Sequence, residues 1–129
     1  MAHTPQNLFM DWLEQFVSLA GYTPSRGMWN ETTATSQKKF VAIWSNAGRT
    51  PSVGVQYPQI RVIVTGRANG RDLGDTVPAE LFAQSIIDAA IENYKTSCAI
   101  NVRPLGSIMG PYYTESNRPW YEINFELTC

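Results

Sequence analysis

The sequence predicts an α+β domain in which two main helices pack on an antiparallel or mixed sheet of about four strands. Apolar residues that recur every three or four positions predict the helices, at about residues 5–20 and 78–95. Apolar, mostly alternating segments predict the strands, at residues 40–45, 58–65, 99–103 and 120–128. With 129 residues and 43% hydrophobic residues, the chain fits one domain spanning residues 1–129.

The first predicted helix begins at Thr4 and Pro5, a capping hydroxyl followed by proline at the first helical position. Its apolar face is unusually aromatic and comprises Leu8, Phe9, Trp12, Leu13, Phe16, Val17 and Ala20. We expect this face to cover one face of the sheet. The alternative is that part of it packs on a neighbouring subunit.

A strand, a turn and a helix form the centre of the predicted fold. Ile60, Val62 and Val64 fall on one face and Arg61 and Thr65 on the other, which is typical of a half-buried strand, and only Ile63 breaks the alternation. The turn at residues 66–74 has three glycines and no apolar run, so we expect neither element to continue through it.

The second helix is predicted to open near Thr76 or Val77, with Pro78 in its first turn. Leu81, Ile87 and Ile91 widen its apolar stripe. The opposite, solvent-facing stripe comprises Glu80, Gln84, Asp88 and Glu92.

Three long loops are predicted, at residues 21–38, 46–57 and 104–119. Loops of this length in a small domain are often functional or ordered by a partner. The first contains Trp29, which either anchors a partner or folds back onto the core. The second forms either a short strand or a protruding arm, and the third carries Tyr112 and Tyr113.

Composition excludes several classes of function. A net charge of -1 leaves no broad basic surface for binding nucleic acid. No apolar run is long enough to span a membrane, and the N-terminus does not resemble a secretory signal. We therefore expect the protein to be made in a cytoplasm and either used there or packaged from there. We therefore expect Cys98 and Cys129 to be free thiols.

The sequence contains no catalytic, cofactor or metal signature. The turn at residues 66–75 lacks the spacing of nucleotide-binding and calcium loops, so we interpret it as a connection or a subunit contact. His3 is the only histidine, which leaves no base for a catalytic triad and no metal-ligand set. We therefore expect no enzymatic activity and no cofactor.

Three arginines, Arg61, Arg67 and Arg71, cluster in the sequence. They either lie on a solvated surface or pair with acidic groups of an adjacent subunit, for which Glu122 and Glu126 are the candidates. Complementary patches on one chain are what a head-to-tail ring requires. The candidate interface residues are therefore Arg61, Arg67, Arg71, Glu122, Glu126, Trp29, Tyr112 and Tyr113.

Residues 57–128 resemble the tail terminator (tail completion, minor tail) proteins of long-tailed bacteriophages. The resemblance rests on the proline-led strand from Tyr57 to Val64, the glycine-containing turn and the helix that follows it. It also includes a strand with Ile100 and Val102, a proline–glycine loop, and a closing strand that starts at Arg118. Residues 1–56 match only by pattern, and the loop at 21–38 has no counterpart.

The resemblance implies a structural virion protein in the tail or neck, assembled in the host cytoplasm. Such proteins form rings, typically hexameric, on the head-proximal end of the tail tube, end its polymerisation and join it to the head. The implied partners are other copies, the tail tube protein and a head-completion (connector) protein, with DNA passing through the lumen without specific binding.

Two other interpretations remain. A head-completion stopper or adaptor of the same neck region would share the size and charge. A small cytoplasmic enzyme or ligand-binding α+β domain would need a concave pocket with converging polar groups.

Overall fold

The computed structural model describes residues 5–19, 21–26, 38–52, 55–92, 101–115 and 117–128. It confirms the predicted α+β class. The helices are α1 (Pro5–Phe16), α2 (Gly70–Leu73) and α3 (Thr76–Glu92). The strands are β1 (Tyr22–Arg26), β2 (Lys39–Ser52), β3 (Val55–Thr65), β4 (Asn101–Pro104), β5 (Met109–Tyr113) and β6 (Pro119–Thr128).

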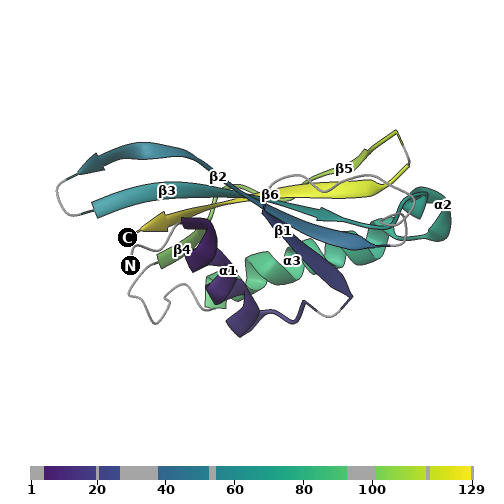
Figure 1. The fold of residues 1–129 in the computed structure, drawn as a ribbon, viewed down its shortest axis with the longest axis horizontal. Helices are drawn as coiled ribbons and strands as arrows, with labels where there is room; N and C mark the ends of the chain where they lie inside the picture. The colour runs from purple at the N-terminus through teal and green to yellow at the C-terminus, as the bar shows by residue number, and fades with distance from the viewer. Residues whose placement is uncertain are drawn as a thin grey trace.

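The described strands form one mixed sheet in the order β1-β2-β3-β6-β4, with β5 also paired to β6 (Figure 1). Strand β1 runs parallel to β2, and every other pair is antiparallel. Strand β4 pairs with the second half of β6 and β5 pairs with its first half, so both lie along the same edge of β6.

The prediction of about four strands was too low, because the sheet has six. Strand β1 lies within the predicted loop at 21–38, and β5 lies within the predicted loop at 104–119. Neither strand alternates apolar and polar residues: β1 reads YTPSR, and β5 reads MGPYY and is exposed throughout. Strands at the margin of a sheet bury little side-chain surface, so their sequences need no apolar period.

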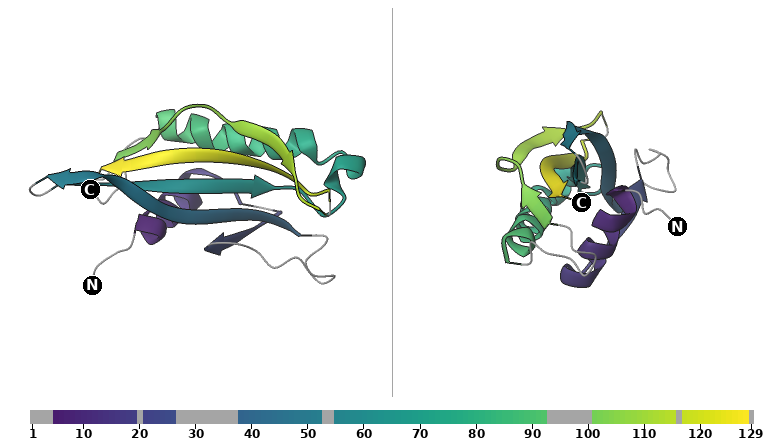
Figure 2. Two further views of the ribbon diagram at one scale, coloured as in Figure 1. Left: turned by 90° about the horizontal axis from the view of Figure 1, so that it is seen from above. Right: turned by 90° about the vertical axis from the view of Figure 1, so that its left-hand side faces the viewer.

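Both long helices lie on the same face of the curved sheet, as the end-on view in Figure 2 shows. The core lies between them and the alternating residues predicted to face inward, including Val62 and Ile123. The ring centroid of Phe9 on α1 lies 5.1 Å from that of Phe125 on β6. The aromatic face of α1 therefore covers the sheet within its own chain, as predicted.

Helix α3 begins at Thr76, and its buried face includes Ile86 and Ile87. The prediction that Leu81 and Ile91 belong to the apolar stripe was wrong: their side chains are 65% and 64% exposed. Small residues explain the difference. The buried face of α3 is built largely from alanines, which let the helix lie close to the sheet and leave the bulkier side chains outside.

The predicted loop at 46–57 is a continuation of two strands. The backbone ladder of β2 and β3 runs from Asn46 opposite Gln59 to Ser52 opposite Val55. Strand β6 pairs with β3 only from Gln59 onwards, so residues 46–52 and 55–58 form a two-stranded ribbon that is paired to none of the other described strands. This ribbon, the β2–β3 arm, projects beyond both long helices (Figure 1).

Candidate functional site

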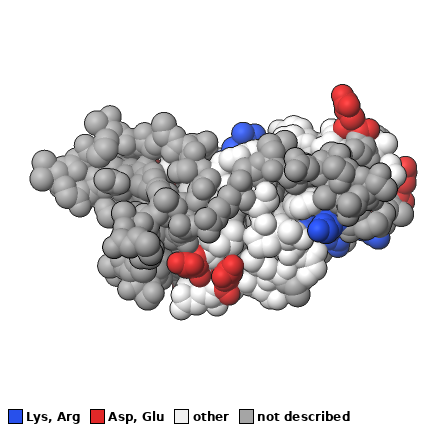
Figure 3. All heavy atoms as spheres, viewed as in Figure 1, with Lys and Arg blue, Asp and Glu red and all other residues white. Residues whose placement is uncertain are grey.

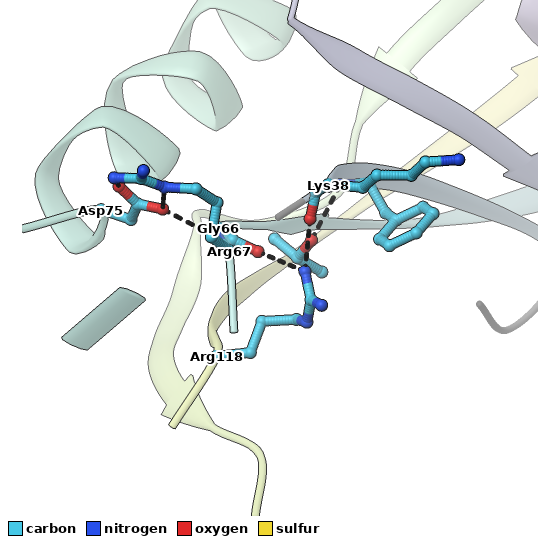
Figure 4. Close-up of polar contacts among 7 residues, drawn as sticks. Lys38, Gly66, Arg67, Asp75 and Arg118 are labelled. Atoms are coloured by element: carbon cyan, nitrogen blue, oxygen red, sulfur yellow. Dashed lines mark hydrogen bonds and ion pairs between the residues drawn. The ribbon is translucent and has the colours of Figure 1, made fainter. Parts of the chain in front are cut away.

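Arg118 is fully buried where three segments of the chain meet. Its Nη1 donates hydrogen bonds to the backbone carbonyl oxygens of Lys38, at 2.5 Å, and Gly66, at 2.7 Å (Figure 4). Its guanidinium carbon lies 5.4 Å from the centroid of the Phe40 ring. The side chain thereby joins the start of β2, the end of β3 and the segment leading into β6.

A second arginine fixes the turn between β3 and α3. The Nε and Nη2 atoms of Arg67 donate to the two carboxylate oxygens of Asp75, each at 2.9 Å, and the backbone N–H of Arg67 donates to Oδ2 at 2.8 Å. Hydrogen bonding to Arg67 holds the pKa of Asp75 below its ordinary value of 3.8. The segment at residues 66–75, which the sequence indicated to be a connection or a subunit contact, contains α2 and this paired, largely buried carboxylate.

Glycine is required in this turn because the backbone passes close to two side chains. A Cβ placed on Gly66 would lie 2.6 Å from Cβ of Asp75 and 2.9 Å from Cγ of Pro119. A Cβ on Gly70 would lie 2.7 Å from Cδ of Pro119. The glycines therefore allow tight packing between the turn and the start of β6, a role unrelated to binding phosphate.

The face of the sheet away from the helices carries two ion pairs. Arg61 Nε donates to Oε1 of Glu122 at 2.7 Å, and its guanidinium carbon lies 4.9 Å from the ring centroid of Trp44. Arg103 donates to the buried carboxylate of Glu126 at 2.8 Å. Because these partners belong to one chain, pairing with a neighbouring subunit is not needed to satisfy Arg61, Glu122 or Glu126.

The candidate tyrosines lie on the exposed strand β5. The ring centroid of Tyr112 is 4.6 Å from that of Trp120, and the hydroxyl of Tyr113 is 3.4 Å from Oγ1 of Thr76. Trp29 and the side chain of Arg71 lie outside the described residues. The structure thus brings Arg61 and Glu122 together and places Arg67 elsewhere, with Asp75, while an interface role for these residues stays a prediction.

Sequence reasoning gave no role to Arg118 or Asp75. A single arginine before Pro119 has no periodicity to mark it as buried, and Asp75 looked like a loop carboxylate. The one available signal was that Arg67 and Asp75, two oppositely charged residues, lie eight positions apart across a glycine-rich turn. This spacing allows their side chains to meet and close the turn.

The described residues show neither a metal-binding cluster nor a membrane-spanning helix. Within the described part of the chain, no group of three or more His, Cys, Asp or Glu residues is placed to hold a metal ion. None of the described helices is both long and apolar enough to cross a membrane.

A family model described as phage tail termination protein matches residues 3–129. The chain belongs to this family. The resemblance inferred from residues 57–128 is therefore confirmed and extends over nearly the whole sequence. A comparison with curated proteins gives no match. Membership of the phage tail termination family makes the chain a structural component of a phage tail, and thus of the virion.

In this tail termination protein, replacing Arg118 with methionine should lower the free energy of unfolding by about 3 kcal/mol, because two carbonyl groups lose a donor. Urea denaturation measures the change. Lys38→Met at the same corner is the matched control, since its side chain is exposed, and should shift stability by no more than about 0.5 kcal/mol. Equal effects of the two substitutions would contradict the structural role of Arg118.

Acid should lower the free energy of unfolding of the wild type more than that of the Asp75→Asn variant. Because the pKa of Asp75 is lower in the folded than in the unfolded chain, its ionised form favours folding above pH 3.8, and this contribution disappears as the pH falls through the folded pKa. Urea midpoints measured from pH 7 to pH 2 should therefore show the variant less stable at pH 7 and the difference shrinking in acid. A constant difference over this range would contradict the assignment.

Proposed function

We propose that this protein forms a hexameric ring on the head-proximal end of the tail tube, where it ends tube polymerisation and offers the surface that joins the head. Its partners are then other copies of itself, the tail tube protein and a head-completion (connector) protein. It acts by binding alone, with no catalysis and no cofactor. Assembly takes place in the host cytoplasm.

The observation that carries this proposal is the family match over residues 3–129. The β2–β3 arm supports it. An isolated two-stranded ribbon is at best marginally stable in water, so an arm that its own sheet does not support is suited to being held by another protein. The two margins of the sheet, β1 on one side and β4 with β5 on the other, also suit contacts between subunits.

The charges on the sheet face away from the helices suit a protein through which DNA passes. Arg61 is neutralised by Glu122, and Arg103 by Glu126. A surface whose arginines are already paired offers few cations to bind phosphates. Wherever this face lies in the ring, it would not retain DNA.

The direct test is the mass of the purified protein by light scattering, over a range of concentrations, with and without purified tail tubes. We expect a ring, either in solution or only when tubes are present to template it. A tube that no longer elongates once the ring has bound would support the terminating role. A protein that stays monomeric at all concentrations and does not bind tail tubes would overturn the proposal.

Replacing residues 46–57 with a two-residue turn should give a folded monomer that cannot form the ring. The remaining parts of β2 and β3 still pair, from Val41 opposite Val64 to Ser45 opposite Ile60, so the core is unaffected. Circular dichroism checks the fold and light scattering checks the assembly. An unchanged ring would remove the β2–β3 arm from the subunit contacts.

A further inference from the structure

Helix α3 presents apolar side chains to solvent on the face that does not pack on the sheet. In the described part of the chain, the exposed large hydrophobic residues all lie on α3 and β5: Val77, Leu81, Ile91, Met109, Tyr112 and Tyr113. The three on α3 are 60–65% exposed and point away from the sheet, whose core takes the alanine face of the helix. Exposed apolar residues grouped in this way mark a surface that binds another protein.

This surface also has a uniform charge. The residues of α3 include three exposed carboxylates, Glu80, Asp88 and Glu92, and neither lysine nor arginine. We call the six residues Val77, Glu80, Leu81, Asp88, Ile91 and Glu92 the α3 outer face. Two copies cannot join through the same α3 outer face, because that would bring six carboxylates together. Its partner should instead be apolar and free of acidic groups.

The β2–β3 arm has that composition. Residues 46–58 include Arg49 and no aspartate or glutamate, and they contribute Val55 and Tyr57. Because the arm projects away from the body beyond both long helices, it is not placed to cover the α3 outer face of its own chain (Figures 1 and 2). Every copy therefore carries an acidic, apolar surface on α3 and, at a separate place, a ribbon whose sequence is basic and apolar and which is paired to none of the other described strands.

We propose that the α3 outer face of one copy binds the β2–β3 arm of a second copy. The contact joins two different surfaces, so repeating it produces a closed ring when the rotation between copies allows closure. This inference rests on the proposed function and deepens it by naming the two surfaces that meet. Figure 3 shows that the opposite side of the molecule carries charges of both signs, with acidic side chains over α1. Because its charge is mixed, that side complements the basic arm less well than the α3 outer face does.

The test uses Leu81→Glu/Ile91→Glu, which adds two carboxylates to the α3 outer face and leaves the arm intact. Both positions are exposed, so the unfolding midpoint should not change. Under the condition in which the wild type forms its ring, the variant should remain monomeric. Gln15→Glu/Lys38→Gln is the matched control, because it changes the net charge by the same two units at exposed positions outside α3, the arm and the margin strands, and it should form the ring normally.

Competition identifies the partner of the surface. In roughly tenfold excess, Leu81→Glu/Ile91→Glu should lower the yield of wild-type rings about tenfold, because its intact arm occupies the α3 outer face of wild-type copies and cannot continue the ring. The same variant with residues 46–57 replaced by a two-residue turn should not inhibit.

Two results would overturn this inference alone: a ring formed by Leu81→Glu/Ile91→Glu, or equal inhibition by the version without the arm. A wild type that makes no ring with or without tubes would overturn the proposed function as well. Fold, assembly and inhibition are measured separately, so the two failures are distinguishable.

Discussion

The buried guanidinium of Arg118 is the interaction on which the arrangement of the sheet depends. Strands β2, β3 and β6 must all begin or end at one corner, and their free backbone carbonyls would be costly to bury there without a donor. Arg118 supplies that donor to Lys38 and Gly66. Next to it, Arg67 and Asp75 close the turn that sends the chain into α3. One end of the molecule is therefore fixed by charged side chains inside the protein, and the apolar core begins beyond it.

The opposite end of the molecule is formed by the β2–β3 arm (Figure 1). There the β2–β3 arm leaves the sheet, and none of the other described strands pairs with β3 before Gln59. A protein that only had to fold would gain little from such an extension. The molecule therefore has one end that its own buried side chains fix and another at which two strands extend beyond the rest of the described sheet.

Much of the fold could be predicted from the sequence, because elements with one buried face repeat their apolar residues at the spacing of a helix or a strand. Strands β3 and β6 alternate because one face lies on the core, and α1 repeats its aromatic residues because they pack against Phe125. Strands β1 and β5 could not be predicted, since they lie at the margins of the sheet and contain prolines. The exposure of Leu81 was missed because apolar periodicity does not say which of two apolar stripes faces inward.

The candidate site was less predictable than the fold. For the arginines the sequence left two alternatives, a solvated surface or pairing with an adjacent subunit. Sequence spacing does not reveal that Arg61 and Glu122 lie on adjacent strands in a register that lets them meet. The corner built on Arg118 depends on contacts between residues up to 80 positions apart, and a pattern within a short window carries no information about them. The family could be recognised from the sequence because the resemblance rests on the order of helices, strands and turns, and the sequence pattern indicates that order.

The central position of β6 has a consequence for the order of events during synthesis. Strand β6 lies between β3 and the pair β4 and β5, yet it is translated after all of them. A nascent chain that has not yet released residues 119–128 from the ribosome lacks Arg118's neighbouring strand and the core residues Tyr121, Ile123, Phe125 and Leu127. At that stage α3 has no completed sheet to rest on. The core is therefore closed in one late step, after the rest of the chain has been made.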